Sequence, residues 1–153
     1  MIHTSTLAFL KSLKKNNNKE WFDANRVKYN AVKENFEAFV SALLEKMVLT
    51  DSDLEALTAK DCIFRINRDI RFSKDKTPYK VNRSAYFSRG GKKSVYAGYY
   101  VHIQPGGQSF AGGGIWMPQS QELKKLRQEI DYCFPEFKKI ISSAPFKKHF
   151  DSL

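Results

Sequence analysis

The sequence predicts one α+β domain over residues 1–153, with a mainly antiparallel sheet of about four strands packed against helices from both ends of the chain. Apolar residues recur every three or four positions near both termini, whereas they alternate in the middle of the chain. The 153 residues are 42% hydrophobic and 14% aromatic, which is enough for one core and too short for two ordinary domains. This composition excludes a chain that is disordered throughout.

Helices are expected over the first 50 residues. A short amphipathic helix carries Phe9 and Leu13 on its apolar face. Asn17, followed three residues later by Glu20, is typical of the capping box that begins a helix. From there to Met47 the apolar spacing predicts one long N-terminal helix of about 28 residues.

The middle of the chain predicts four strands, because polar and apolar residues alternate there between turn-forming residues. The expected strands are residues 62–72, 84–88, 95–104 and 109–117. A Pro-Gly-Gly turn at 105–107 joins the last two strands. Glycines at 112–114 indicate either close packing of a neighbouring element or room for a ligand beside the backbone.

The last part of the chain predicts C-terminal helices. Pro118 ends the preceding strand, and Ser120 can cap a helix whose apolar positions repeat at helical spacing. Pro135 fits the first turn of a second helix, where a missing N–H has no cost. Together with the long N-terminal helix, these helices would cover the sheet.

Positive charge is concentrated in one segment of the chain. The whole sequence carries a formal net charge of +10, and residues 60–93 contain 11 basic and 3 acidic side chains. Residues 94–120 contain no Asp, Glu, Lys or Arg. A surplus focused in this way attracts anions, so the expected partners are a phosphate group, a nucleic acid or an acidic protein.

Membrane and metal partners are not expected. No apolar run approaches the about 20 residues of a membrane helix, and the N-terminus lacks a signal-peptide pattern, so we expect a cytoplasmic protein. The two cysteines and three histidines show no metal-ligand spacing, and no sequence motif calls for a cofactor.

Arg68 is the residue that most needs a partner. It interrupts the apolar face of the first expected strand between Ile66 and Ile70, where a lone guanidinium is costly to bury. It must therefore contact a carboxylate or a bound anion, or the strand must bulge. The nearby carboxylates are those of Asp61, Asp69 and Asp75.

The segment around Arg68 predicts an anion clamp. Arg65, Arg68 and Arg71 can bind a phosphate or carboxylate through paired N–H groups. The following loop would close over that ligand, with Tyr79 stacking on a base or ring. The loop's lysines are Lys74, Lys76 and Lys80. The alternatives are local Arg–Asp pairs on a solvated surface and a mobile basic loop.

An enzyme is the second hypothesis. Asp69 or Asp75 would act as the base and His102 as the acid, on a phosphorylated or carboxylated substrate. Tyr100 shares the strand face of His102, and Gly113 would admit the ligand. A half-buried, hydrogen-bonded histidine is the alternative for His102. The third hypothesis is a non-catalytic protein-interaction domain in which the Arg–Asp network is structural.

Three long motifs resemble an uncharacterised, mostly bacterial family, also found in fungi, that is catalogued as a domain of unknown function. They read FLKSLKKNNNKEWFDANRVKY, FRINRDIRFSKDKTPYK, and AGYYVHIQPGGQSFAGGGIWMP followed by SQELKKLRQEI. Family members look longer, which implies either a short member or a missing C-terminal segment. The family's signature positions fall on Arg65, Arg68, Asp69, Arg71, Phe72, Ser73, Lys74, Asp75, Lys76, Pro78, Tyr79, Lys80, Gly98, Tyr100, His102, Pro105 and Gly112 to Gly114.

Overall fold

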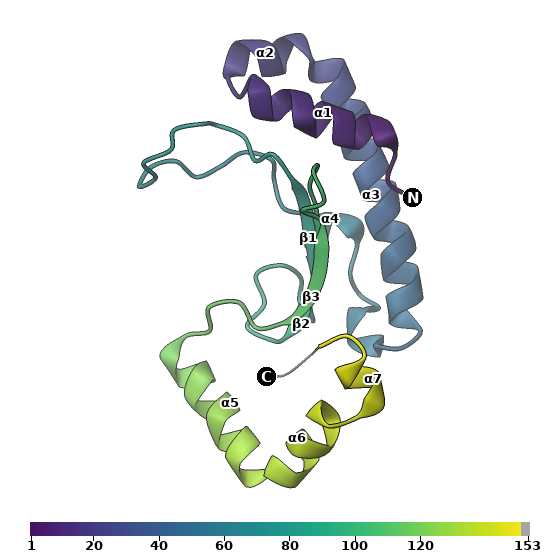
Figure 1. Cartoon of the computed structure of the whole chain (residues 1–153), viewed down its shortest axis with the longest axis vertical. Coiled ribbons are helices and arrows are strands. Elements are labelled where there is room, and N and C mark those ends of the chain that lie inside the picture. Colours follow the sequence, from purple (N-terminus) through teal and green to yellow (C-terminus); the bar gives the residue numbers. More distant parts are fainter. Residues whose placement is uncertain (151–153) are drawn as a thin grey trace. The chain divides into compact units, whose positions relative to one another are not determined.

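The helical and alternating segments of the sequence fold into two units in the computed structural model, which describes residues 1–150 (Figure 1). The first unit, Met1–Ile115, contains the N-terminal helices and the sheet. The second unit, Trp116–Leu153, contains the C-terminal helices within its described residues 116–150. The α+β class is therefore confirmed.

The N-terminal helices are α1, α2 and α3, which span Thr4–Lys15, Lys19–Ala24 and Arg26–Val48. The prediction of one helix of about 28 residues is wrong, because the helix breaks at Asn25. The Asn25 side-chain amide donates to the Trp21 carbonyl at 2.9 Å and so competes with the helical ladder.

The start of α2 also differs from the prediction by one residue. Asn18, and not Asn17, is its N-cap, and the Asn18 side chain accepts the Trp21 N–H at 2.9 Å. Asn17 is left to pair with a segment far along the chain, as described below.

The sheet has three antiparallel strands in the order β1-β2-β3. These strands are Arg83–Phe87, Gly98–Ile103 and Phe110–Gly114. The turn predicted between the last two is present, with Gly106 and Gly107 at φ of +84° and +73°, values that favour glycine. The prediction of about four strands is thus one strand too many.

The missing strand is the one expected at 62–72. Its first residue ends helix α4, Ala59–Cys62, which follows the short 3₁₀ helix η1, Ser52–Leu54. The rest of the segment forms only two isolated bridges, Ile63 with Ala85 and Asn67 with Tyr79. Beyond the first bridge the chain leaves the sheet, because Arg68 finds its carboxylate within a loop that folds back on itself.

The core of the first unit lies between α3 and one face of the sheet. In one cluster Phe36 and Val40 of α3 pack with Ala85 and Phe87 of β1, together with α4. A second cluster joins α1, α2 and α3 to Ile66, within the segment expected as the first strand, and to Tyr79 after it. Its buried members are Phe9, Leu10, Leu13, Phe22, Val32, Ile66 and Tyr79. The opposite face of the sheet carries the polar and aromatic residues of the candidate site.

The second unit contains helices α5, α6 and α7, at Ser120–Tyr132, Phe134–Ile141 and Ala144–Lys147. The first two lie where the sequence predicts helices, and Pro135 is in the first turn of α6. None of these three helices contains a buried residue. No helix within residues 1–150 has an apolar stretch long enough to span a bilayer.

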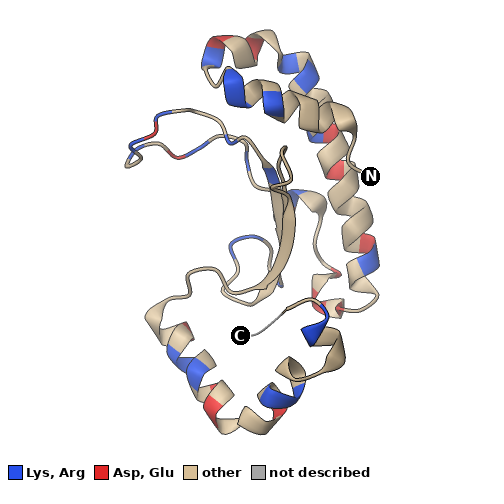
Figure 2. Cartoon of the chain, in the orientation of Figure 1, with Lys and Arg blue, Asp and Glu red and all other residues tan. Residues whose placement is uncertain are grey.

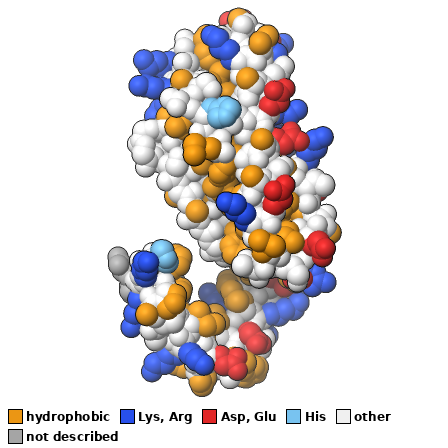
Figure 3. All heavy atoms as spheres, turned by 90° about the vertical axis from the view of Figure 1, so that its right-hand side faces the viewer, with side chains coloured by type: hydrophobic (Ala, Val, Ile, Leu, Met, Phe, Trp, Pro, Cys, Tyr) orange, Lys and Arg blue, Asp and Glu red, His pale blue; other side chains and the backbone are white. Residues whose placement is uncertain are grey.

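Charge is distributed unevenly over the first unit. Figure 2 shows Lys and Arg on the loop before β1 and on the loop after it, whereas β2 and β3 carry no charged side chain. The side of α3 that faces away from the sheet carries acidic and basic side chains next to one another (Figure 3). The basic loop that precedes β1 is therefore the candidate for an anion-binding site.

Candidate anion-binding site

Residues 67–79 form a loop that we call the arm, and it is closed at its root by backbone pairing. The Arg68 N–H donates to the Pro78 carbonyl at 2.9 Å, and the Lys80 N–H donates to the Ile66 carbonyl at 2.8 Å. The Asn17 side chain pairs with the backbone of Tyr79 in both directions, donating to its carbonyl at 2.8 Å and accepting its N–H at 3.1 Å. The arm therefore begins from a fixed base.

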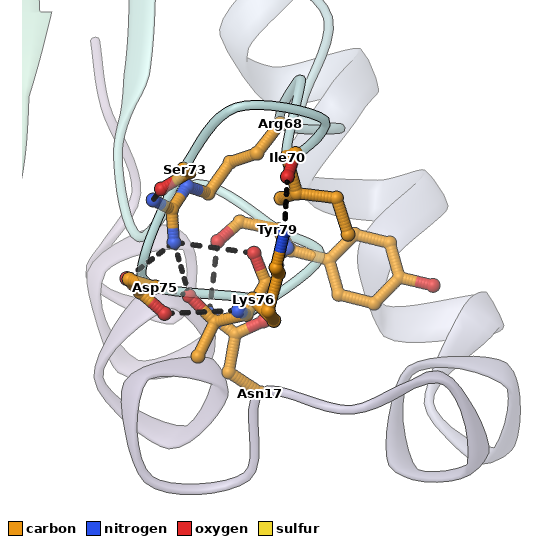
Figure 4. A network of polar contacts seen from close by, with 8 residues as sticks. Asn17, Arg68, Ile70, Ser73, Asp75, Lys76 and Tyr79 are labelled. Atoms are coloured by element: carbon orange, nitrogen blue, oxygen red, sulfur yellow. Dashed lines mark hydrogen bonds and ion pairs between the residues drawn. The ribbon is translucent and has the colours of Figure 1, made fainter.

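Arg68 holds the arm from inside (Figure 4). Its Nη1 donates to Asp75 Oδ2 at 2.5 Å and to both the hydroxyl and the carbonyl of Thr77, and its Nη2 donates to Ser73 Oγ at 3.4 Å. Of the three carboxylates that the sequence offered, Asp75 is thus the partner. The Thr77 N–H, the Arg68 guanidinium and the Thr77 hydroxyl lower the pKa of Asp75 to about 2.

Two further contacts brace the arm. Arg71 binds Asp69 through two side-chain bonds, Nε to Oδ1 at 2.9 Å and Nη2 to Oδ2 at 2.6 Å. These hydrogen bonds lower the pKa of Asp69, and the charge of Arg65 contributes at longer range. Lys76 Nζ donates to the Ile70 carbonyl at 3.0 Å, as Figure 4 also shows.

The predicted clamp of three arginines is therefore not assembled. Arg68 and Arg71 are each neutralised by a carboxylate of the arm itself, and only Arg65 of the three has no ion pair within residues 1–150. The alternation would have placed Arg65 and Arg71 on one strand face and Arg68 on the other, and it fails because this segment is not a strand. Lys74 stays exposed, with no ion pair in the described part of the chain.

Tyr79 does not fit the predicted stacking role. Its ring is buried and stacks on the Phe22 ring, with 3.9 Å between centroids and 14° between planes. This position follows from the bridge at Asn67 and the pairing with Asn17, which turn the side chain toward α2 and α3. The ring is therefore part of the core, and a ligand cannot stack on it.

Three basic side chains without a carboxylate partner lie at the root of the arm. We call Arg65, Lys80 and Arg83 the cation cluster, because none of them forms an ion pair within residues 1–150. Lys80 Nζ lies 5.4 Å from the centroid of the Phe64 ring. Burial lowers the pKa of Lys80, and the positive charges of Arg65 and Arg83 lower it further.

Arg83 is the buried member of the cation cluster. Only 3% of the residue is exposed, its guanidinium lies 5.1 Å from the centroid of the Phe36 ring, and its Nε has no hydrogen-bond partner. Burial lowers the pKa of this guanidinium, and the nearby Tyr29 hydroxyl opposes that shift. A charged donor in this setting is costly unless a bound group compensates its charge.

The open face of the sheet carries an ordered row of side chains on β2. The Tyr100 hydroxyl and His102 Nδ1 are 3.0 Å apart, and His102 Nε2 is 3.0 Å from Gln104 Oε1. An amide oxygen can only accept, so Nε2 carries the proton and Nδ1 accepts the Tyr100 hydroxyl. The His102 ring also stacks on the Phe110 ring, with centroids 4.9 Å apart.

The structure does not bring the predicted catalytic residues together. Both nitrogens of His102 are engaged by its neighbours on the sheet, while Asp69 is paired with Arg71 on the arm. No hydrogen bond or ion pair between described residues links Asp69 or Asp75 with His102. Nor do three potential metal ligands of the His, Cys, Asp and Glu types gather anywhere in residues 1–150.

The glycines of β3 leave open space beside the strand. A Cβ at Gly112 would meet no atom within 4 Å, and one at Gly113 would meet only the Gly98 carbonyl at 3.7 Å. Close packing therefore does not explain these two positions. In the β2–β3 register Gly112 is opposite Tyr100 and Gly113 is opposite Tyr99, so Gly113 faces away from Tyr100.

Gly98 is the glycine that close packing requires, although the sequence pattern points to the glycines at 112–114 for packing and to Gly98 only as a family signature position. A Cβ there would collide with the Phe87 carbonyl and lie 2.7 Å from Ser88 Cβ. Nothing near it within the expected strand 95–104 indicates this contact. Asn17 and Arg83 were also missed as site residues: Asn17 gave a capping signal, and Arg83 only added to the basic count.

The root of the arm and the open sheet face are connected by aromatic contacts. The Phe64 ring, which lies under Lys80, is 6.5 Å from the Tyr100 ring, which is in turn 5.6 Å from the Phe110 ring. Lys80 of the cation cluster thus borders a surface of aromatic side chains, whereas Arg83 lies toward Phe36 on the core face of β1. Such a surface offers charge and ring faces to a ligand.

Comparison with known proteins gives a family and no further relatives. Searches of curated proteins and of solved structures found no match to this chain. A family model described as a conserved hypothetical protein (DUF2461) matches residues 5–153, and no function is established for that domain. Because the match covers almost the whole chain, the chain belongs to the DUF2461 family of conserved hypothetical proteins.

Proposed function

We propose that this domain binds a phosphate-bearing anion at the cation cluster of Arg65, Lys80 and Arg83. The supporting observation is that the charges of Arg65 and Arg83 both act on Lys80, and that none of the three has a carboxylate partner in residues 1–150. A bound anion would supply the missing charge and accept hydrogen bonds from the guanidinium groups.

The proposed site differs in membership from the predicted clamp. The proposed site keeps Arg65 and Lys80 of the predicted clamp and adds Arg83. Arg68 and Arg71, which are paired with carboxylates, stabilise the arm instead. The Phe64 ring lies next to both Lys80 and Tyr100. A ligand larger than a phosphate group, bound at Lys80, would therefore extend over the aromatic face. The ligand class is an anion with a phosphate group, alone or as part of a nucleotide or nucleic acid.

The enzyme hypothesis has less support than binding. Asp75 has a pKa of about 2 and the pKa of Asp69 is also lowered, which makes both carboxylates weak bases. Neither contacts His102. Binding without turnover therefore accounts for the arrangement with fewer assumptions.

Thermal unfolding in the presence of pyrophosphate tests the proposal. A ligand at 100 times its Kd stabilises the folded state by about 2.7 kcal/mol, which raises Tm by about 5–10 °C in a protein of this size. Lys80→Gln should lose most of that shift. Lys33→Gln, which removes an exposed lysine from α3, should keep it. Equal shifts in the two variants, or none in the wild type, would contradict the proposed site.

A further inference from the structure

The arm presents an aromatic ring that the fold does not use. Phe72, next to the midpoint of the arm, is 96% exposed, and the Arg71 guanidinium lies 5.8 Å from the centroid of its ring. Single exposed apolar residues are ordinary on protein surfaces. Phe72 differs because the loop that carries it is held in one shape.

The fixed shape comes from contacts on both sides of Phe72. Before it, Arg71 is bound to Asp69 by two hydrogen bonds, and after it Ser73 donates its N–H to the Ile70 carbonyl at 3.3 Å. The Arg68 network and the Lys76 contact described above brace the rest of the arm. Ordering a backbone residue costs about 1–2 kcal/mol of conformational entropy, and in the arm this cost is met before any ligand arrives.

Positive charge surrounds the exposed ring. Residues 67–79 contain four basic and two acidic side chains, and both acids are already engaged by arginines. Lys74 is exposed without an ion pair, and Lys76 contacts only a backbone carbonyl, so both lysines keep their charge available. The arm therefore combines a free ring face with free cations.

We infer that the arm is a stacking site for single-stranded nucleic acid, with a base on the Phe72 ring and phosphates at Lys74 and at the cation cluster. Rings stack on bases of any identity, and lysines bind the phosphates between them. A single strand is required, because a base inside a duplex has no free face to offer. The inference rests on the proposed function and names the ligand class.

The dimensions of the first unit are compatible with this ligand. Lys80 is eight positions after Phe72 in the chain, so the two lie at most about 28 Å apart even if the chain were fully extended. A strand that rises about 3.4 Å per nucleotide covers that distance with ten nucleotides. One ligand can therefore contact the arm and the cation cluster together.

An acidic protein partner is less consistent with the surface. Stable protein interfaces surround their anchor residues with a buried apolar core. The immediate neighbours of Phe72 are instead Arg71 and Ser73, and the following residues are Lys74 and Asp75. A lone ring among charged groups suits a flat base better than an apolar protein patch.

Fluorescence anisotropy with four polyanions tests the inference. The probes are a ten-nucleotide oligothymidylate, an abasic strand of equal length, inorganic polyphosphate and polyglutamate. We expect the wild type to bind the oligothymidylate more tightly than the abasic strand. Phe72→Ala should weaken oligothymidylate binding by about 5- to 150-fold, the effect of losing one stacked base, and leave polyphosphate binding unchanged.

Two further variants separate stacking from general effects. Phe72→Trp should retain oligothymidylate binding, and its fluorescence should be quenched as the base stacks. Tyr132→Ala, which removes another exposed aromatic ring from α5, should behave as the wild type. Equal affinity for oligothymidylate and abasic strand, or no effect of Phe72→Ala, overturns the inference while leaving anion binding intact.

The remaining outcomes are also decisive. Polyglutamate binding as tight as oligothymidylate binding, and dependent on Phe72, would identify an acidic protein partner and overturn the inference. Absence of binding to all four polyanions would overturn both the inference and the proposed function. Because Phe72 is exposed, Phe72→Ala is expected to fold, and an unchanged Tm verifies this.

Discussion

Replacing Arg83 by methionine should stabilise the ligand-free protein and abolish its response to phosphate. Methionine has a similar reach but carries no charge and leaves no donor unpaired. The unpartnered Nε costs about 1–3 kcal/mol, and the attraction to the Phe36 ring offsets about 0.5–2 kcal/mol. Apolar replacement of buried charges is often neutral or stabilising by about 1–4 kcal/mol.

We therefore expect Arg83→Met to raise the free energy of unfolding by about 1 kcal/mol, which corresponds to about 2–4 °C in Tm for a chain of 153 residues. Differential scanning calorimetry should be carried out with and without pyrophosphate. Saturating pyrophosphate should reverse the order, because the wild type gains about 2.7 kcal/mol at 100 times Kd and the variant gains nothing.

Arg26→Met provides a matched control. Arg26 also lies over a phenylalanine ring, 4.9 Å from the Phe22 centroid, but it is half exposed and has Asp23 as a partner. Its replacement should change stability by less than about 0.5 kcal/mol and leave the pyrophosphate response intact. If Arg83→Met instead destabilises the protein by more than about 1 kcal/mol, Arg83 is a structural residue and the reasoning fails.

Two further predictions concern the arm and the sheet. An acid whose pKa is lowered on folding adds stability above its unfolded pKa, so the Asp75 contribution should disappear as the pH falls from about 4 toward 2, and Asp75→Asn should remove this part of the acid-unfolding curve measured by circular dichroism. An Asp75→Asn curve that overlays the wild type across this range would contradict the assignment. Gly98→Ala should lower the free energy of unfolding in urea by about 1–3 kcal/mol, because its Cβ collides with the Phe87 backbone, whereas Gly112→Ala enters open space and should lose less than about 1 kcal/mol. Equal losses of stability at the two glycines would show that the close approach of Phe87 does not determine the effect of Gly98→Ala.

Much of the fold could be predicted because its signals are local. The spacing of apolar residues predicts α1, α5 and α6, and alternation with the Pro-Gly-Gly turn predicts β2 and β3. The break between α2 and α3 was not predictable from spacing, since the apolar stripe continues through it. It depends on one side chain, that of Asn25, and on its bond to the Trp21 carbonyl.

The arm shows why a strand pattern can mislead. Residues 62–72 alternate as a strand does, but Arg68 requires a carboxylate, and the one it binds lies seven residues further on. Meeting that requirement folds the chain back, so the strand face that would have carried Arg65 and Arg71 does not exist. The need for a partner was predictable, whereas the choice of Asp75 among three acids depends on the turn at Thr77.

Other parts of the site depend on contacts between distant segments. Asn17 and Tyr79 are 62 residues apart, and nothing near either residue indicates that they pair. The burial of Arg83 results from the packing of α3 on β1, which no local pattern specifies. For this reason the basic segment could be identified from sequence, but the residues within it that lack partners could not.

The central claim is that the cation cluster stays electrically unbalanced until an anion binds, and the pKa of Lys80 measures this directly. NMR titration of the Lys80 side chain in the free protein should give a pKa below the ordinary value of 10.5, because of burial and the charges of Arg65 and Arg83. Pyrophosphate should raise that pKa, since a nearby negative charge favours the ammonium form. A pKa at or above 10.5 in the free protein, unchanged by pyrophosphate, would contradict the claim.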